Sequence, residues 1–380
     1  MHDLIVFGED YGSLPSSTQH LINGLADDRK VIWVNSIGLR QPKLSVKDAK
    51  RAFNKCFSGR NSALKQTYSK TDENHGRSNI TQVNLLTIPA PSSAMARKVA
   101  RELMLRQLMP VLEKAELKQP ILWSSLPTAA DLCGHLNEHA VVYYCGDDFS
   151  ALAGVDHDTV SKHEEKMADK ANLILTASDA LTGKFPAHKT RLLSHGVDQK
   201  LFSIPAAIAP QLAELKQANQ RPVAGFYGSI SEWLDYPLLD EVTESLPDWD
   251  FVFIGPLATS KNPLPQRDNV HYLGPKAHHE LPGFSQHWDV SMLPFSQNQQ
   301  IAACSPLKLA EYIVAGRPIV TTPFPALGGY QKYVHCADNT GTFIQSLMAA
   351  RDDSSIPAHA LQHQSWDEKS RFLSWLMELL

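Results

Sequence analysis

Short runs of apolar residues alternate along this chain with longer stretches that have helical spacing. In the first half the apolar runs are DLIVFG, KVIWVNS, VNLLTIP, PILWSS, AVVYYCG, NLILTAS and TRLLSHG. An uninterrupted apolar run of this length is typical of a strand that is buried on both faces. The alternation therefore predicts a parallel sheet that is covered on both sides by helices.

The rhythm breaks near residues 195–221 and starts again near Pro222, with VAGFYGS, DFVFIGP, NVHYLGP, DVSMLPF, RPIVTT and YVHCAD. A chain of 380 residues with 43% apolar composition also exceeds what one hydrophobic core usually supports. We therefore predict an α/β protein with domains at residues 1–200 and 201–360. Residues 361–380 are predicted to form a helix that returns to the first domain and buries most of its large apolar residues, which are Trp366, Phe372, Leu373, Trp375, Leu376 and Leu379.

Charge is unevenly distributed, although the net charge is only −4. Residues 1–200 carry 25 Lys and Arg against 22 Asp and Glu, whereas residues 201–380 carry 11 against 18. Ten basic residues gather between Arg40 and Arg77, and residues 43–78 show no clean hydrophobic period. This segment is either an anion-facing surface or a solvated insertion.

The five cysteines are scattered and form no CxxC pair, which indicates free thiols in a reducing compartment. No basic head precedes an apolar stretch at the start, and no apolar run approaches the ~18 residues of a membrane span. We expect a cytoplasmic protein without a nucleic-acid partner, whose membrane contact, if any, is peripheral on the inner membrane. The basic, apolar stretch Met95–Leu117 could lie on an anionic membrane or pack on its own sheet.

Residues 304–322, CSPLKLAEYIVAGRPIVTT, combine features of a ligand-binding helix. Ser305 is a suitable N-cap and Pro306 suits the first helical position, so the free backbone amides that follow from Leu307 would attract a phosphate. Lys308 adds a positive charge at that end, and Glu311 can accept hydrogen bonds from vicinal hydroxyls such as those of a ribose. An ordinary capped helix with a solvated Lys and Glu remains the alternative.

Glycines that follow apolar strands mark further ligand positions. Gly228 and Ser229 follow VAGFY, where the missing side chain lets the backbone approach a phosphate closely. Gly274 and Lys276 follow NVHYL, at the strand end where we place the nucleotide base. A turn that requires a positive φ is the competing interpretation of the glycine at position 228.

Two regions of the first domain could serve an acceptor. The strand AVVYYC leads to Asp147 and Asp148, and a carboxylate there could deprotonate an acceptor hydroxyl. We favour Asp148 slightly over Asp147, although one could instead cap a helix and the other could be solvated. The loop GEDYGSLPSSTQH supplies the expected acceptor contacts, which are Gly12, Ser17, Gln19 and His20; His20 could equally be a helix-packing residue.

Two D-x-D sequences, Asp156–Asp158 and Asp248–Asp250, suggest a metal-dependent alternative. The first is typical of a helix cap and the second of a turn before a strand. His278 and His279 lack the spacing and the partners of a metal site. We expect no metal and no cofactor, because helix amides and Lys308 can stabilise a leaving diphosphate.

The stretch SPLKLAEYIVAGRPIVTT resembles the donor-nucleotide motif of GT-B glycosyltransferases, particularly the family-four-like bacterial enzymes and the xanthan glucuronosyltransferase group. HGVD before LF, GFYGSISEWLDYPLL, FVFIGP, NVHYLGPKAHHELPGFSQHWDVSMLPF and the terminal SW helix follow in the family's order. The resemblance covers nearly all of residues 195–375 and implies two Rossmann-like domains, the N-terminal one for the acceptor and the C-terminal one for the donor.

The resemblance also implies a function. The enzyme would move a sugar from a nucleoside-diphosphate sugar, with UDP preferred, to a carbohydrate or lipid-linked carbohydrate in surface or exopolysaccharide assembly. The helix amides would hold the diphosphate and Glu311 the ribose, and the xanthan enzyme is similar in having a proposed Asp base in the region of Asp147 and Asp148.

One position departs from the resemblance. Family-four enzymes usually carry a Glu eight residues before the ribose Glu, and Ala303 stands there in this chain. The donor sugar and the choice between inversion and retention therefore stay open. Two other functions also remain open, namely a sugar-nucleotide epimerase of the same fold, which would need no acceptor, and a catalytically inactive scaffold that binds a nucleotide or glycan.

Overall fold

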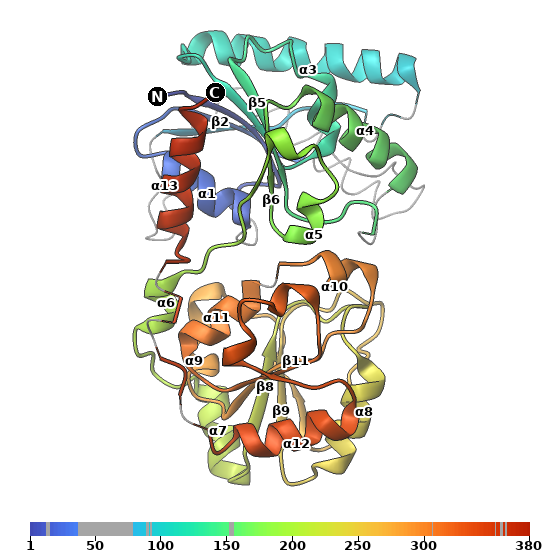
Figure 1. Ribbon diagram of the computed structural model, residues 1–380, viewed down its shortest axis with the longest axis vertical. Coiled ribbons are helices and arrows are strands. Elements are labelled where there is room, and N and C mark those ends of the chain that lie inside the picture. Colours follow the sequence, from blue (N-terminus) through green and yellow to red (C-terminus); the bar gives the residue numbers. More distant parts are fainter. Residues whose placement is uncertain are drawn as a thin grey trace. The chain divides into compact units, whose positions relative to one another are not determined.

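The computed structural model describes residues 1–12, 16–36, 79–88, 91, 93–151, 156–305, 307–353, 355–357, 360–361 and 363–380. The chain forms two compact units, one of Met1–Ser194 with Lys369–Leu380 and the other of His195–Glu368 (Figure 1). The insertion predicted at residues 43–78, with Cys56 and the basic run from Arg40 to Arg77, lies outside the described residues.

The first unit is built on a seven-stranded parallel sheet with the order β3-β2-β1-β4-β5-β6-β7. Its strands are β1 (Leu4–Phe7), β2 (Val31–Val34), β3 (Ile80–Val83), β4 (Ile121–Ser124), β5 (Ala140–Cys145), β6 (Leu173–Thr176) and β7 (Thr190–Leu192). Every residue of β1, β2, β4, β5 and β6 is buried. This double-sided burial explains the uninterrupted apolar runs of the sequence.

The helices of the first unit begin at polar caps. They are α1 (Ser17–Leu25), α3 (Ala94–Ala115), α4 (His157–Lys170) and α5 (Asp179–Thr182), with short 3-10 helices at η1 (Pro127–Asp131) and η2 (Ala187–Lys189). Side chains of Ser16, Ser93, Asp156 and Ser178 accept a backbone N–H at the start of the four α-helices. The prediction that Asp156 is a helix cap is confirmed.

The third strand differs from its prediction. The apolar run VNLLTIP predicts a strand at residues 83–89, whereas β3 spans Ile80–Val83. Val31 pairs with Ile80 and Val34 with Val83, so the ladder stops where β2 stops. Beyond the sheet, the backbone N–H and C=O of Leu86 bond to the Gln107 side chain of α3, at 3.0 and 2.8 Å. The side-chain amide of Gln107 thus satisfies the backbone groups of Leu86 that a longer β3 would have paired with a neighbouring strand.

Helix α3 both packs on its unit and presents an apolar surface. Its buried residues are Ala100, Met104, Leu108 and Leu112. Met95, Val99 and Leu103 lie on another face and are 72%, 43% and 40% exposed. Among the described helices, none combines the length and the apolar composition that crossing a membrane requires.

The second unit contains a six-stranded parallel sheet with the order β10-β9-β8-β11-β12-β13. Its strands are β8 (Val223–Tyr227), β9 (Asp250–Ile254), β10 (Val270–Tyr272), β11 (Val290–Leu293), β12 (Ile319–Thr321) and β13 (His335–Cys336). The strand order reverses direction between β8 and β11, as it does between β1 and β4 in the first unit. Open parallel sheets bind ligands outside the carboxyl ends of strands at such points.

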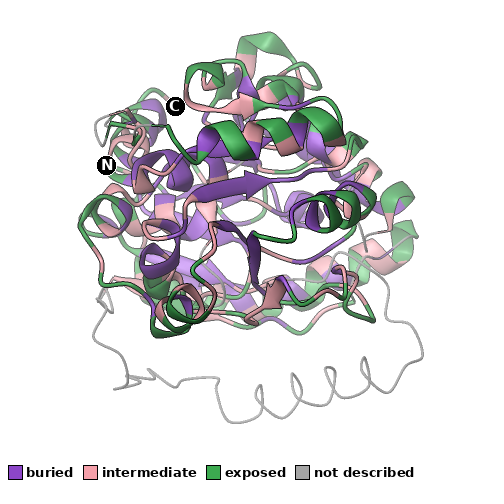
Figure 2. Cartoon of the chain, turned by 90° about the horizontal axis from the view of Figure 1, so that it is seen from below, coloured by how far each residue is buried: buried purple, intermediate pink, exposed green. Residues whose placement is uncertain are grey.

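Seven α-helices in the described part of the second unit surround this sheet or connect its strands. They are α6 (Gln199–Ser203), α7 (Pro210–Asn219), α8 (Tyr236–Ser245), α9 (Pro282–Ser285), α10 (Gln299–Ala303), α11 (Leu307–Ala315) and α12 (Thr340–Ala350), and the short 3-10 helices are η3 (His278–Glu280), η4 (Pro325–Leu327) and η5 (Gln331–Tyr333). Helix α11 ends as predicted, because Gly316 adopts a φ of +85° directly after it. The central strands are buried in both units, while the outer faces of many helices are exposed (Figure 2).

The last helix, α13 (Trp366–Met377), packs beside α1 (Figure 1). The Ser370 hydroxyl donates to the backbone oxygen of Leu21 at 3.2 Å, and Arg29 donates to Ser374. The prediction that most of its large apolar residues are buried was wrong, because the helix has one buried face only. Trp366, Leu373 and Leu376 lie on that face, whereas Phe372, Trp375 and Leu379 are exposed.

Candidate functional site

The carboxyl end of β8 is shaped around a glycine and a lysine. Gly228 follows the strand with a φ of +146°, and its N–H donates to the oxygen of Ile254 at 2.8 Å. A Cβ at this position would lie 2.0 Å from Cε of Lys308. Glycine is therefore required here both by the backbone conformation and by the close approach of the lysine side chain.

Lys308 lies in the first turn of α11 and forms no hydrogen bond or ion pair with any other residue in the described ranges. Burial lowers the pKa of Lys308, while the carboxylate of Glu311 and then the thiol of Cys304 act in the opposite direction. A desolvated ammonium beside a helix N-terminus is unfavourable alone, and a bound anion would compensate it. Ser305 and Leu307 are half-buried beside it, and Pro306 lies outside the described residues.

Glu311 lies one turn further along α11 and is only 4% exposed. Its Oε2 accepts the Tyr227 hydroxyl at 2.9 Å, and its Oε1 lies 3.0 Å from Nε2 of His278. A carboxylate can accept about four hydrogen bonds, so each oxygen keeps one acceptor position. A buried carboxylate with one remaining position on each oxygen is suited to bind a pair of neighbouring hydroxyls.

The two side chains that bond this carboxylate are themselves packed against aromatic rings. Tyr227 meets Tyr312 edge to face with ring centroids 4.8 Å apart, and Phe202 meets His278 in the same way at 5.5 Å. Burial, followed by the charge of Glu311, raises the pKa of Tyr227, so its hydroxyl stays protonated and donates to the carboxylate. The Tyr312 hydroxyl accepts the backbone N–H of Tyr227 at 2.9 Å, which ties α11 to β8.

His278 is the residue of this group that sequence reasoning missed. It lies in η3, on the segment after β10, and comes against Glu311 through the fold rather than through any local spacing. Burial opposes protonation of His278, but its hydrogen bond to Glu311, the charge of Glu311 and the charge of Asp198 outweigh burial and raise its pKa. The carboxylate of Glu311 therefore favours the protonated form of the imidazole.

The other residues predicted to bind the nucleotide sugar follow the carboxyl ends of β8 and β10. Ser229 is half-buried directly after Gly228. Gly274 follows β10 with a φ of +69°, has open space where a side chain would begin, and its backbone oxygen accepts the N–H of Gly255 at 3.0 Å. Lys276 is half-buried on the segment that leads from β10 to His278.

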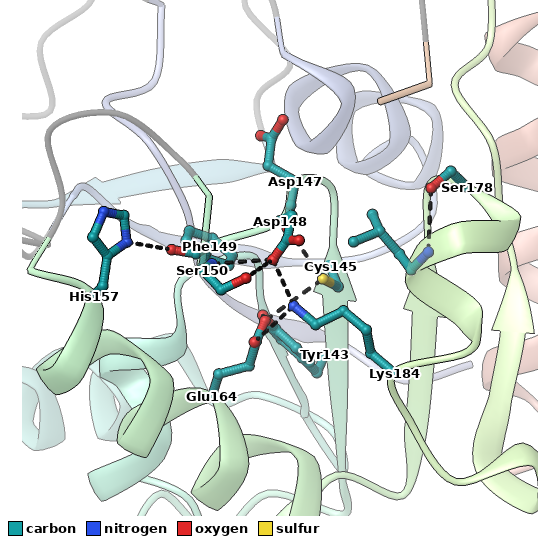
Figure 3. A network of polar contacts seen from close by, with 11 residues as sticks. Tyr143, Cys145, Asp147, Asp148, Phe149, Ser150, His157, Glu164, Ser178 and Lys184 are labelled. Atoms are coloured by element: carbon teal, nitrogen blue, oxygen red, sulfur yellow. Dashed lines mark hydrogen bonds and ion pairs between the residues drawn. The ribbon is translucent and has the colours of Figure 1, made fainter. Parts of the chain in front are cut away.

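In the first unit, the acidic pair after β5 is split between two environments (Figure 3). Oδ1 of Asp148 accepts the N–H and the hydroxyl of Ser150 at 3.0 and 2.6 Å, and the ammonium of Lys184 at 2.7 Å. Burial alone would raise the pKa of Asp148. The hydrogen bond and the charge of Lys184 and the hydrogen bonds from Ser150 outweigh burial, so the pKa of Asp148 is lowered. Asp148 is thus held as a carboxylate.

A second carboxylate, that of Glu164, also contacts the Lys184 ammonium. Glu164 of α4 is buried, and its Oε2 lies 3.3 Å from the Lys184 ammonium while its Oε1 accepts the Tyr143 hydroxyl at 2.8 Å. Burial opposes the charge of Lys184, but its hydrogen bond to Asp148 and the two carboxylates raise its pKa. The ammonium is therefore fixed between two negative charges from different elements.

Asp147 is exposed and its side chain points away from this network (Figure 3). Its carboxylate forms no hydrogen bond or ion pair within the ranges that the structure describes. Desolvation by the surrounding chain, followed by the charge of Asp148, raises the pKa of Asp147 although the residue is open to solvent. Asp147 is therefore the member of the pair whose two carboxylate oxygens are both unbonded in the described ranges, whereas Oδ1 of Asp148 accepts three hydrogen bonds.

The predicted acceptor loop is held together by its own residues. Gly12 has a φ of +82°, and its N–H donates to Oε1 of Gln19 at 3.2 Å, while Nε2 of Gln19 reaches Glu9 at 3.5 Å. Gln19 is buried and acts inside the loop, whereas Gly12 is exposed and His20 is half-buried. Ser17 hydrogen bonds the Tyr144 hydroxyl, and burial raises the pKa of neighbouring Glu9.

No group of three or more His, Cys, Asp or Glu in the described ranges is arranged to hold a metal ion. Asp156 caps α4 by accepting the N–H of Thr159 at 3.3 Å. Asp250 is buried at the start of β9, where Asn219 and His271 bond its carboxylate.

The fold is shared with solved structures that bind nucleotide sugars. The Anabaena protein HepE in complex with UDP and glucose matches with a TM-score of 0.67 and 12% identity over 100% of both chains. An E. coli chain bound with UDP-2-fluoro glucose matches with a TM-score of 0.64 and 15% identity, over 100% of this chain and 99% of that one. The predicted α/β fold with two Rossmann-like domains of the GT-B type is thereby confirmed.

Sequence similarity points to a more particular relative. The chain is 30% identical over 233 residues to TuaH of Bacillus subtilis (strain 168), described as a "Putative teichuronic acid biosynthesis glycosyltransferase". The similar region is 56% of this chain and 58% of TuaH, so the chain matches little more than half the length of that relative. No protein-family model matches the chain. The narrower resemblance to family-four or xanthan-type enzymes stays a prediction.

Proposed function

We propose that this protein is a glycosyltransferase that moves a sugar from a nucleoside-diphosphate sugar to a carbohydrate or lipid-linked carbohydrate, in the assembly of a surface polysaccharide. The observation that carries the proposal is the group formed by Gly228, Lys308 and Glu311 at the end of β8. HepE crystallised with UDP and glucose supports a UDP-sugar as the donor, and the description of TuaH as a putative glycosyltransferase of teichuronic acid biosynthesis supports the transfer reaction.

The proposed donor site divides the nucleotide among chemically matched groups. The diphosphate would lie against Gly228, Ser229, the amides from Leu307 onward and the ammonium of Lys308. The ribose hydroxyls would take the remaining acceptor positions of Glu311. The base would lie near Gly274 and Lys276, because these follow β10 and the carboxyl ends of β10 and β8 lie along the same edge of the sheet.

We assign acceptor activation to the acidic pair of the first unit. A sugar hydroxyl becomes a good nucleophile only as its proton is removed, and a carboxylate within reach can take that proton. Of the two residues, the exposed and unbonded Asp147 is better suited to be the base. Asp148 is less suited, because its Oδ1 already accepts three hydrogen bonds. Gly12, Ser17 and His20 are the proposed acceptor contacts, with Gln19 supporting their loop.

We also propose that the transfer needs no metal ion. Lys308 and the N-terminal amides of α11 would neutralise the charge that develops on the leaving diphosphate. Added EDTA should therefore leave transfer activity intact, as measured by release of the nucleoside diphosphate. Activity that EDTA abolishes and manganese or magnesium restores would contradict this part of the proposal.

Peripheral membrane contact is proposed through the exposed face of α3. Met95, Val99 and Leu103 are exposed there, and the neighbouring Lys98 and Arg106 are exposed cations. Each cation near an anionic surface contributes about 1 kcal/mol, and the apolar side chains can enter the headgroup region. Full-length protein should sediment with phosphatidylglycerol vesicles but not with phosphatidylcholine vesicles, and Val99→Ser with Leu103→Ser should weaken this. Equal sedimentation of both proteins would exclude this face.

A thermal-shift panel of nucleotides and nucleotide sugars tests the donor site, because a ligand that binds only the folded state raises its stability. UDP should stabilise the protein, and calorimetry should show that Glu311→Ala weakens UDP binding by about 1.5 to 3 kcal/mol. Gly228→Ala should also weaken it, whereas Gly329→Ala, at a glycine with open space, should not. Unchanged affinity in both site variants would refute the donor site.

A product assay separates transfer from the related chemistries. An epimerase would convert the donor without any acceptor, and an inactive scaffold would bind nucleotide without releasing it from a sugar. A glycosyltransferase should release UDP at a rate that rises with the acceptor concentration. Acceptor-independent conversion of the donor sugar, followed by NMR, would exclude the proposed reaction.

A further inference from the structure

His278 occupies a position at the proposed donor site that its sequence neighbours do not share. Its Nε2 lies 3.0 Å from Oε1 of Glu311, and the imidazole is packed edge to face on Phe202 of α6. The side chain of His278 is 27% exposed against 5% for Glu311, so the pair reaches from the buried carboxylate toward solvent. The adjacent His279 is exposed and has no interaction in the structure with Glu311.

We propose that His278 is a positioning residue of this site, which together with Tyr227 orients the Glu311 carboxylate so that it can accept both hydroxyls of a ribose. This inference rests on the proposed nucleotide site and adds to it a residue from another segment of the chain. His278 itself need not touch the nucleotide.

The argument begins with the rotation of the carboxylate. A glutamate side chain rotates about three torsions, and its terminal torsion has only a broad preference. One hydrogen bond leaves the carboxylate plane free to turn about that bond. Tyr227 holds Oε2 from β8 and His278 holds Oε1 from η3, so the two oxygens are fixed from two different elements.

The second step concerns the acceptor positions that remain. A neighbouring diol needs two acceptors at a set spacing, and the two oxygens of one fixed carboxylate provide them. If His278 is removed, Oε1 loses its donor and the carboxylate can turn, so ordering it becomes part of the cost of binding. The loss should therefore appear only with ligands that carry the diol.

The third step concerns charge. Glu311 is almost fully buried, and an ionised carboxylate is stable there only with donors or a compensating charge. The imidazole, when protonated, supplies both at Oε1, the oxygen that Tyr227 does not bond. A glutamine at position 278 keeps a donor for Oε1 but carries no charge, so it separates orientation from charge compensation.

The test compares UDP with 2′,3′-dideoxyuridine diphosphate on full-length protein by calorimetry. His278→Ala should weaken UDP binding about threefold to tenfold, the size of one hydrogen bond, and should change binding of the dideoxy nucleotide less than about twofold. His278→Gln should recover most of the lost UDP affinity. His279→Ala is the matched control and should bind both nucleotides as the unaltered protein does.

The outcomes separate this inference from the proposed function. If Glu311→Ala weakens UDP binding but His278→Ala behaves like His279→Ala, the nucleotide site stands and the role of His278 is refuted. Equal losses for UDP and the dideoxy nucleotide would also refute it, because His278 would then act on the phosphates or on the fold. If His278→Ala does not fold, a UDP affinity of His278→Gln below that of His279→Ala by tenfold or more would refute it as well. Failure of UDP to bind the unaltered protein would instead refute the proposed donor site.

Discussion

Each unit places carboxylates beyond the carboxyl end of a strand, but the two units treat them in opposite ways. Glu311 in the second unit is nearly inaccessible, and both its oxygens are bonded to neutral or titratable donors, Tyr227 and His278. In the first unit Asp148 is tied to an ammonium, whereas Asp147 has no bonded partner in the described ranges and is exposed. One carboxylate is arranged to accept hydrogen bonds without moving, and the other is left free to take a proton.

Under the proposed function, this difference separates recognition of the donor from proton transfer, although both use a carboxylate. A carboxylate that binds a diol must be held in place, and hydrogen-bond donors from two elements hold Glu311. A general base must lose and regain a proton near the working pH, which strong hydrogen bonds to the ionised form would prevent. Asp148 has the strong bonds, whereas desolvation, followed by the negative charge of Asp148, raises the pKa of Asp147.

The largest expected effect concerns this division within the acidic pair. If the enzyme inverts, Asp147→Asn should reduce kcat by about 10²-fold to 10⁴-fold, the usual contribution of a general base. Asp148→Asn should cost about tenfold or less, because Asp148 only supports its neighbour. UDP affinity should be unchanged in both variants, since these residues belong to the acceptor side of the proposal.

Two measurements decide this prediction. Steady-state kinetics with the nucleotide sugar that stabilises the protein give kcat for each variant, and NMR of the product gives its anomeric configuration. A larger loss in Asp148→Asn than in Asp147→Asn would reverse the assignment. A retained anomeric centre would remove the need for an Asp base, because the leaving phosphate can then accept the proton.

The elements that sequence predicted well are those whose signal is local. A parallel strand buried on both faces must be apolar at consecutive positions, so β1, β5 and β8 were visible as runs. The α11 region was visible because Lys308, Glu311 and the terminal Gly316 occur within one short stretch. The third strand was displaced because the apolar run VNLLTIP continues past the end of the ladder.

The residues that sequence did not predict depend on distant contacts. His278 and Glu311 are 33 residues apart, and Lys184 and Asp148 are 36 apart. No spacing rule connects such pairs, and a single His or Lys in a loop has many ordinary roles. Without Lys184 in view, nothing in GDDFS indicated which aspartate would be bonded and which would be free.

A smaller effect is expected for the ammonium that separates the two aspartates. Lys184→Met leaves Asp148 and Glu164 without their cation, and we expect a loss of about 1 to 2 kcal/mol in the free energy of unfolding at pH 7. The folded-state pKa of Asp148 lies below its unfolded value, so this stabilisation is present above the unfolded pKa and is lost as the pH falls through the folded pKa.

Urea unfolding at pH 7 and at pH 3 checks this prediction. The difference between the unaltered protein and Lys184→Met should shrink at the lower pH, as Asp148 becomes protonated. Lys162→Met, at an exposed lysine of α4 that forms no bond within the described ranges, is the matched control and should show little difference at either pH. A Lys184→Met loss that is the same at both values would mean that the ammonium does not stabilise Asp148.

The smallest expected effect tests the contact between His278 and Glu311 in the second unit, and its pH dependence has the opposite sign. The folded-state pKa of His278 is raised, so its stabilisation is fully present below the unfolded value of about 6.5 and is lost as the pH rises through the folded pKa. His278→Gln keeps a donor to Glu311 but cannot be protonated. The unaltered protein should therefore exceed His278→Gln in unfolding free energy by on the order of 1 kcal/mol at pH 5.5, and by less at pH 9.

His279→Gln should show no such trend, because His279 is exposed and does not contact the carboxylate. If the excess over His278→Gln instead grew between pH 5.5 and pH 9, the imidazole would be neutral beside Glu311, and both units would then hold their fixed carboxylates by the same acid-sensitive means.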